Sequence, residues 1–408
     1  MMTNISFIHV ADLHLDSPFT GLSSVPDHIF NEIQNSTFRA LDRMVQYAIE
    51  KDVDFVLIVG DLFDNEKQSL KAQLRLKQAF ETLQEHQISV YVSYGNHDFI
   101  NGNIHPITYP SNVYVFPDET VRHVIHKKHG EDAAAIYGFS YENRAVTVNK
   151  TDAYTIQQSH IPFHIAMLHG SIANDTEHDK YAPFHLGDLV KESFDYWALG
   201  HIHKRQVLKN DPPIIYPGNI QGRNRKETGK KGCYYINMTK NNNDIQFLPL
   251  QEIEFYNHMI DISDVTEAGG LEARLMEEIT NDQYTTSRLI SITFTSNNPD
   301  ILEWELQHYF SDMIEFINEQ WMERKPWMYM YHYTLRLVDE HRIHEHDHFI
   351  GELDKIISDI TLSKHVQELY GHREARKYLE RLAVKEEREI RQAAKQLLLH
   401  ELMKSGRG

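Results

Sequence analysis

The chain has 408 residues, of which 41% are hydrophobic and 25% charged, and its formal net charge is −18. This composition predicts a globular protein of two to three domains and argues against a broad basic surface for nucleic acid. No run of about 18 apolar residues exists, so no membrane span is expected. Cys233 is the single cysteine, and the N-terminus lacks the basic and apolar regions of a secretory signal; both features favour a cytoplasmic protein without internal disulfides.

The first 250 residues alternate between strand-like and helix-like segments. Short apolar runs predict strands at residues 5–10, 55–59, 88–93, 165–168 and 196–199. Between the first three runs, apolar residues recur at helical spacing: Phe38, Leu41, Val45 and Ala48, and then Leu76, Ala79, Phe80 and Leu83. The alternation of strands and helices predicts an α/β layered domain over residues 1–250.

The pattern changes near residue 250. Strands are expected at residues 255–262, 289–295 and 328–337, with helices at residues 271–279 and 301–317. These elements predict a smaller α+β capping domain over residues 251–340. The remaining segment, residues 341–408, contains repeated Leu and Ile among many charges. It predicts two or three amphipathic helices, which either bind a partner or pack on their own domain.

Five polar motifs follow five of the predicted strands. They are D-x-H at residues 12–14, G-D-x-x-D at 60–64, G-N-H-D at 95–98, H-G at 169–170 and G-H-x-H at 200–203. Ligands bind beyond the carboxyl ends of strands in an open α/β sheet, so these motifs are expected to converge on one cleft. A glycine before a ligand run would let the backbone bend sharply without a Cβ clash.

The mixture of Asp, His and Asn side chains in these motifs suits Mn²⁺, Fe or Zn²⁺ better than Ca²⁺ or Mg²⁺ alone. Seven such donors exceed one tetrahedral site and match two adjacent ions that share a carboxylate. A pair of ions about 3.5–4 Å apart supports in-line displacement at phosphorus. One motif alone has simpler explanations, since Gly-Asn is also turn chemistry; the prediction depends on all five in order.

In this order over residues 12–203, the motifs resemble those of the calcineurin-like metallophosphoesterases. The resemblance implies a four-layer β-sandwich flanked by helices and a pair of divalent metal ions, with Mn²⁺ expected. It implies that one ion is held by Asp12, His14, Asp61 and His203, and the other by Asp61, Asn96, His169 and His201. It also implies that His97 stabilises the transition state or donates a proton, and that Asp64 and Asp98 support the histidines.

Three longer stretches narrow the resemblance. HVADLHLDSPFTGL, GDLFDNEKQSLKAQLRL and YPGNIQGRNRKETGKKGC are similar to the SbcD/YhaO-type DNA repair exonuclease branch of the family. This implies a nuclease domain at residues 1–250, DNA as substrate and an SMC-like coiled-coil ATPase as partner, and it leaves a homodimer open. One departure is NEKQS after GDLFD, where the branch tends to have prolines. This difference weakens the transfer of the branch's dimer and DNA-end geometry to this chain.

The sequence therefore predicts a two-metal phosphodiesterase, most specifically a DNA exonuclease. Lys204, Arg205, Arg223 and Arg225 follow two of the motifs and are candidate nucleic-acid contacts, with a solvated charged loop as the alternative. Two other functions stay open: a metallophosphoesterase for small substrates, and a scaffolding subunit that binds DNA ends.

Overall fold

The computed structural model describes residues 4–22, 25–64, 68–102, 107–173, 181–280, 284–298 and 300–337, with isolated positions 356, 387, 390, 391 and 394. Two compact units result. The larger comprises Met1–Asn257, Tyr284–Ser291 and Arg324–Tyr331; the smaller takes the described parts of His258–Gln283, Ile292–Glu323 and the segment from His332. The three-domain division at residues 250 and 340 stays a prediction. The predicted C-terminal helical region, 341–408, lies outside the described residues apart from the five isolated positions.

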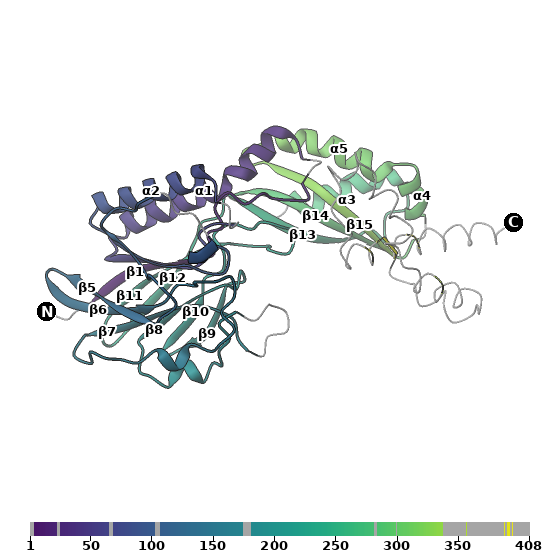
Figure 1. Cartoon of the computed structure of the whole chain (residues 1–408). Helices are drawn as coiled ribbons and strands as arrows, with labels where there is room; N and C mark the ends of the chain where they lie inside the picture. The colour runs from purple at the N-terminus through teal and green to yellow at the C-terminus, as the bar shows by residue number, and fades with distance from the viewer. Residues whose placement is uncertain are drawn as a thin grey trace. The chain divides into compact units, whose positions relative to one another are not determined.

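Two six-stranded sheets build the larger unit (Figure 1), with strand orders β12-β11-β1-β2-β3-β4 and β5-β6-β7-β8-β10-β9. The first sheet contains β1 (Ile5–Ala11), β2 (Phe55–Val59), β3 (Ser89–Ser93), β4 (Val113–Val115), β11 (Gly232–Met238) and β12 (Asn243–Pro249). The second contains β5 (Arg122–Lys128), β6 (Glu131–Gly138), β7 (Phe163–His169), β8 (Tyr196–Gly200), β9 (Gln206–Asn210) and β10 (Pro213–Tyr216). Strands β1 to β4 are mutually parallel, as are β6, β7, β8 and β10. The predicted strands of this region are confirmed.

Strand β2 shows how the core is divided. Phe55, Leu57 and Val59 join the apolar cluster between the two sheets. Val56 and Ile58 point the other way, into the cluster beneath the helices. Successive side chains of a strand face opposite sides, so a strand buried on both faces needs the continuous apolar run that the sequence contains.

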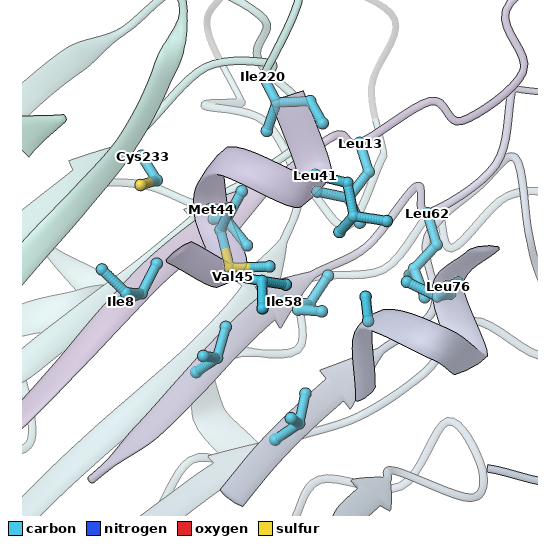
Figure 2. Packing of buried hydrophobic residues seen from close by; sticks show 14 of the residues in the cluster. Ile8, Leu13, Leu41, Met44, Val45, Ile58, Leu62, Leu76, Ile220 and Cys233 are labelled. Atoms are coloured by element: carbon cyan, nitrogen blue, oxygen red, sulfur yellow. The ribbon is translucent and has the colours of Figure 1, made fainter. Parts of the chain in front are cut away.

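Two long helices, α1 (Asp27–Glu50) and α2 (Leu70–Glu85), cover the outer face of the first sheet. Figure 2 shows Leu41 and Met44 of α1 and Leu76 of α2 in one cluster with Ile8 and Ile58 of the sheet. The eight residues expected from helical spacing are all buried: Phe38, Leu41, Val45, Ala48, Leu76, Ala79, Phe80 and Leu83. The helix–sheet layer is therefore as predicted. No helix in the described part of the chain is both long and apolar enough to cross a membrane.

The outer face of the second sheet has a different cover. Loops carrying the short 3-10 turns η2 (Thr151–Ala153) and η3 (Asp188–Val190) lie in this region, and η1 (Ile100–Gly102) precedes them. Buried Tyr154 and Phe184 pack against this sheet. Between α2 and α3, the described residues contain no α-helix. The expectation of helices flanking the sandwich is correct for one side; on the other, aromatic side chains in loops bury the sheet instead.

A third sheet contains β13 (Ile253–Asp261), β14 (Ser287–Ser296) and β15 (Met328–Leu337), in that order. Arg288 donates its N–H to the Trp327 carbonyl, and Thr293 lies beside Thr334 farther along both strands, so β14 and β15 run parallel. The connecting helices are α3 (Leu271–Thr280), preceded by η4 (Ala268–Gly270), then α4 (Ile301–Leu306) and α5 (Tyr309–Met322). These elements are the strands and helices expected of an α+β unit.

One helix prediction in this unit is wrong. The sequence predicted a single helix over residues 301–317, whereas α4 and α5 are separate. His308 lies between them in the left-handed conformation, with φ of 64°. A non-glycine residue in that region cannot continue a right-handed helix. No Gly or Pro marks the break, so the sequence pattern did not reveal it.

Candidate metal centre

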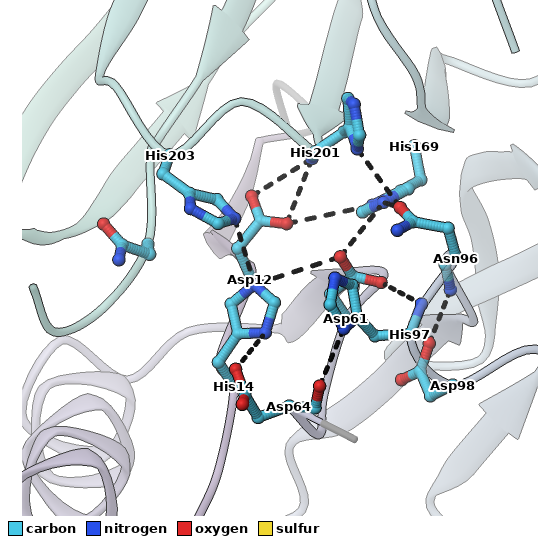
Figure 3. Close-up of polar contacts among 12 residues, drawn as sticks. Asp12, His14, Asp61, Asp64, Asn96, His97, Asp98, His169, His201 and His203 are labelled. Carbon is cyan, nitrogen blue, oxygen red and sulfur yellow. Dashed lines mark hydrogen bonds and ion pairs between the residues drawn. The ribbon is translucent and has the colours of Figure 1, made fainter. Parts of the chain in front are cut away.

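The five polar motifs lie at the carboxyl ends of five strands. Three follow β1, β2 and β3 of the first sheet, and two lie at the ends of β7 and β8 of the second. Figure 3 shows their side chains pointing toward one another. They form two sets of closely spaced ligand atoms, which we name the first group (Asp12, His14 and His203) and the second group (Asp61, His169 and His201, with Asn96 beside them).

The backbone that presents these side chains is strained. Asp12, His14, Asp61 and His201 have φ values of 52°, 43°, 52° and 94°, in the region that favours glycine. Such residues cost about 1–3 kcal/mol each and persist where the surroundings hold them. Loop-to-loop hydrogen bonds do so here: the N–H groups of Asp12 and His14 donate to carbonyls of the loop after β2 at 3.2 and 3.0 Å.

Three glycines permit the close approach of the loops. Gly60 has φ of 76°, and a Cβ there would lie 2.1 Å from the His169 ring. At Gly95 a Cβ would lie 2.3 Å from Asp61 Oδ1, and at Gly200 it would lie 2.1 Å from a backbone oxygen. The predicted reason, a sharp bend, applies to Gly60. At the other two positions the reason is space, because any side chain would occupy the place of a candidate ligand or its support.

In the first group, two imidazole nitrogens face each other: His14 Nε2 and His203 Nε2 are 3.0 Å apart. His203 Nδ1 is 2.8 Å from a carboxylate oxygen of Glu227, an acceptor, and 3.2 Å from Arg223 Nη2, a donor. The shorter contact, to the carboxylate, favours the ring proton on Nδ1, which leaves the lone pair on Nε2. His14 Nδ1 is buried and lies farther from a carboxylate, 3.4 Å from Asp64 Oδ1, without a hydrogen bond to any described residue. Two lone pairs at this distance repel each other unless a cation or a proton lies between them.

The second group has the same property. His169 Nδ1 is 3.0 Å from the carbonyl oxygen of Val59, so Nδ1 carries a proton and Nε2 is the nitrogen left to bind a ligand. That nitrogen faces Asn96 Oδ1 at 3.0 Å and Asp61 Oδ2 at 3.5 Å. His201 Nδ1 is 3.2 Å from the same Asn96 oxygen. The convergence of nitrogen and oxygen lone pairs fits a divalent transition-metal ion.

Asp61 lies between the two groups. Its Oδ2 is 3.5 Å from His169 Nε2 in the second group and 3.9 Å from His14 Nε2 in the first. Its Oδ1 accepts the backbone N–H of His97 at 3.0 Å, which fixes the carboxylate plane. A single oxygen within reach of both groups is the arrangement that a bridging ligand needs, so the residues present fit a pair of ions.

His169 and the carboxylates of the metal centre shift each other's pKa. Burial lowers the pKa of His169, but the Asp61 and Asp12 carboxylates outweigh burial and raise it to about 9. Burial would raise the pKa of Asp61, yet His169 beside it holds that pKa well below its usual value. A metal ion that binds His169 would therefore compete with a proton.

His97 stands beside the first group. Its Nδ1 donates to the backbone carbonyl of Asp64 at 2.7 Å. Its ring lies edge-on to that of His14, with 5.0 Å between the ring centres. Since Nδ1 is committed to a carbonyl acceptor, Nε2 is the nitrogen that can meet a substrate oxygen.

The two predicted supporting aspartates behave differently. Asp64 Oδ1 lies 3.4 Å from His14 Nδ1 and its backbone carbonyl holds His97. Asp98 accepts the backbone N–H groups of Leu62 at 2.7 Å and Gly95 at 2.6 Å. Within the described part of the chain, its contacts tie the loops after β2 and β3 together instead of orienting a histidine ring. Asp98 therefore positions backbone in this structure, and its support of the histidines stays a prediction.

The four predicted nucleic-acid contacts fall into two classes. Lys204 and Arg205 are exposed, and the Arg205 guanidinium lies 3.8 Å from the centre of the Phe247 ring. Arg225 is half-buried. Arg223 differs from these three, because it pairs with carboxylates of the metal centre and its side chain is only 16% exposed.

Sequence reasoning missed Glu227. Its carboxylate accepts from His203 Nδ1 and from Asn219 Nδ2, each at 2.8 Å, and from the Arg223 N–H at 2.8 Å. It lies within the YPGNIQGRNRKETGKKGC stretch, which was read for its basic residues. One glutamate among basic residues was the available signal, but its partner could not be identified without the fold.

Comparisons with known proteins agree with this geometry. A model of the calcineurin-like phosphoesterase family matches residues 5–205. The chain is 38% identical to the "Uncharacterized metallophosphoesterase YhaO" of Bacillus subtilis, over 98% of this chain and 99% of that protein. It is 27% identical to the DNA double-strand break repair protein Mre11 of Methanocaldococcus jannaschii, over 61% of this chain and 66% of that protein. It is 25% identical to Mre11 of Thermoplasma acidophilum, over 60% and 65% of the two chains. The matched motifs, the two-group site and the full-length relative confirm the expected resemblance: the chain belongs to the calcineurin-like metallophosphoesterase family.

Proposed function

We propose that this chain is a two-metal-dependent phosphodiesterase, and specifically a DNA exonuclease that acts in DNA repair. The observation that carries the proposal is the convergence of both groups on the Asp61 carboxylate, with His97 beside them. In this proposal one ion is held by Asp12, His14, Asp61 and His203, and the other by Asp61, Asn96, His169 and His201. Mn²⁺ is the ion that we expect, since the donors mix imidazole nitrogen with carboxylate and amide oxygen.

Two divalent ions at these groups would polarise the phosphate and activate water for attack on phosphorus. The chain's own residues supply the rest. Asp61 adds negative charge between the groups, while Asn96 adds an oxygen without a charge that would repel phosphate. His97, held through Nδ1, presents Nε2 to a phosphate oxygen or to the leaving oxygen, where it donates a proton or hydrogen bond as charge develops.

DNA as the substrate is supported by two observations. The partial relatives are named DNA double-strand break repair proteins, and Lys204 and Arg205 stand exposed directly after the G-H-x-H motif. The net charge of −18 opposes the approach of a polyanion. Affinity of the isolated chain should therefore be weak and fall steeply with salt.

A nuclease assay with each metal in turn tests the substrate class. Full-length protein is given single- and double-stranded DNA and a small phosphodiester, with Mn²⁺, Mg²⁺ or Zn²⁺. The proposal predicts Mn²⁺-dependent release of nucleotides from DNA ends. The double variant Lys204→Glu/Arg205→Glu should weaken DNA cleavage and spare the small diester. A matched double variant of exposed basic residues elsewhere, Lys127→Glu/Lys191→Glu, should change neither reaction. Turnover of the small diester with intact DNA would favour a small-substrate phosphoesterase.

We further propose that the chain works with an SMC-like coiled-coil ATPase that binds the segment 341–408. The support is the sequence pattern of that segment, whose Leu and Ile residues can form an apolar helix face. Ile356→Asp and Ile360→Asp in the full-length chain should abolish association with the ATPase and leave cleavage of the small diester unchanged. Retained association would contradict the docking role. Loss of DNA repair in cells on this change, with normal repair by an Asp61→Asn chain, would instead favour a scaffolding subunit.

A further inference from the structure

Five side chains around the first group form a closed ring of polar contacts. His14 Nε2 faces His203 Nε2 at 3.0 Å, and His203 Nδ1 faces Glu227 Oε1 at 2.8 Å. The Arg223 guanidinium lies 3.5 Å from the same Glu227 oxygen and also pairs with Asp64. Asp64 Oδ1 closes the ring at 3.4 Å from His14 Nδ1.

The outer part of this ring is a charged cluster largely removed from water. The side chains of Arg223, Asp64 and Glu227 are 16%, 13% and 11% exposed. The Glu227 carboxylate lies 2.8 Å from His203 Nδ1 and 3.5 Å from the Arg223 guanidinium. Asn219 and the Arg223 backbone N–H also donate to this carboxylate. These contacts fix the Glu227 carboxylate in place.

We propose that Glu227 and Arg223 are positioning residues that set the affinity of the first group for its metal ion. Glu227 holds His203 in the tautomer that turns the Nε2 lone pair toward His14. Arg223 offsets the charges of Glu227 and Asp64 at once. It thereby keeps the two carboxylates on the outer side of the histidine rings, where they orient ligands, instead of turning inward to become ligands themselves.

The proposed effect of Glu227 and Arg223 is confined to the ion of the first group. In the second group, His169 is held by the Val59 carbonyl and His201 faces Asn96, so neither ring depends on Glu227 or Arg223. Outer partners of metal-bound histidines typically change metal affinity by about 10–100-fold when they are removed. Removal of Glu227 or Arg223 should therefore weaken metal binding at the first group and leave metal binding at the second group unchanged.

The test is isothermal titration calorimetry, in which Mn²⁺ is added to metal-free, full-length protein. Glu227→Gln preserves shape and removes the charge; it should weaken one of two binding steps by about 10–100-fold and leave the other unchanged. Arg223→Met should do the same, and Arg223→Lys should recover part of the loss because it keeps the charge but not the planar fork. Glu252→Gln is the matched control, since Glu252 also pairs with two arginines, Arg39 and Arg43, outside the metal centre; it should bind both ions like the wild type.

One further measurement, and two outcomes of the titration itself, can each disprove the proposal. Nitrogen NMR of the metal-free wild type, with the His203 signal assigned by its loss in His203→Asn, should show the proton on Nδ1; a proton on Nε2 overturns the proposal even if Glu227→Gln does not fold. Equal weakening of both steps, or two unchanged steps, overturns it as well.

The inference rests on the metal centre of the proposed function but not on its substrate. Absence of DNA cleavage with two intact binding steps would end the nuclease proposal alone. A wild type that binds no ion would end both.

Discussion

The first and second groups of the metal centre use the same kinds of donor but are supported in different ways. The first group depends on charged side chains from distant stretches, since Glu227 and Asp64 lie beyond the His203 and His14 rings. The second group depends on backbone: the Val59 carbonyl accepts from His169, and Tyr141 donates to the His169 carbonyl at 2.8 Å. A chemical change of a side chain should therefore alter the first group, and a steric change of the backbone should alter the second.

This difference follows from where each group lies on the fold. The His169 ring sits over Gly60, at the centre where the ends of β2 and β7 meet. A Cβ at Gly60 would meet the His169 ring, and the ring nitrogen Nδ1 is held by the main-chain carbonyl of Val59. His203 lies past the end of β8, where the loop after β10 can bring Glu227 and Arg223 against its outer side. The position of His169 at the centre therefore restricts which residues can support it, whereas the position of His203 at the edge allows different supporting side chains.

The largest effect is expected where the two groups share a ligand. Asp61→Asn removes the charge that lies between them, which leaves two cations facing each other without a shared carboxylate. The loss of cleavage should exceed the about 10²–10³-fold that one preorganised donor contributes. Cleavage of a small diester at saturating Mn²⁺ measures it. A variant within tenfold of the wild type would mean that Asp61 does not bridge the groups.

His97 and Asn96 are neighbours with different predicted roles. His97→Gln should reduce the cleavage rate by about 10²–10³-fold, while the protein still binds two ions. Asn96→Ala should instead lose an ion from the second group, and high Mn²⁺ should restore part of its rate. Elemental analysis beside cleavage rates distinguishes the two. If added Mn²⁺ rescues His97→Gln, the histidine is a ligand and the division of roles is wrong.

Gly60→Ala tests the steric control of the second group. The new Cβ would meet the His169 ring, so one ion should be lost while the first group keeps its own. Gly130→Ala is the matched control, because Gly130 has φ of 87° but open space around its Cβ position. Both changes carry the backbone strain of about 1–3 kcal/mol, and only Gly60→Ala should alter metal stoichiometry. Equal metal content in the two variants would contradict the steric account.

The smallest effect is expected from Tyr141→Phe. This change leaves the buried His169 carbonyl without the donor that the tyrosine supplies at 2.8 Å. It should lower the free energy of unfolding by about 1–3 kcal/mol, measured by denaturant titration. Metal affinity of the first group should not move. If this variant lowers the metal affinity of the first group, the two groups are not supported separately.

The sequence predicted the parts of the molecule that follow from local pattern. Five apolar runs became strands, and the motifs after them converge because the carboxyl ends of parallel strands share an edge of the fold. Helical spacing identified the buried faces of α1 and α2. These features depend on residues within a few positions of one another, so periodicity is sufficient to find them.

The parts that the sequence did not predict depend on distant contacts. Asp64 pairs with Arg223 across 159 positions of the chain, and Glu227 reaches His203 across 24. Neither distance leaves a local pattern, so the sequence indicates neither the pairing of Arg223 with Asp64 nor the contact of Glu227 with His203. The break at His308 similarly reflects one left-handed residue that no glycine or proline announces.

The central claim is that this chain holds two adjacent metal ions joined by Asp61. The most direct test is to titrate the metal-free, full-length protein with Mn²⁺ and to record electron paramagnetic resonance spectra at each addition. The account predicts two ions per chain whose spins are coupled, and loss of the coupling in Asp61→Asn. A single ion at saturation, or two ions without coupling in the wild type, would contradict it.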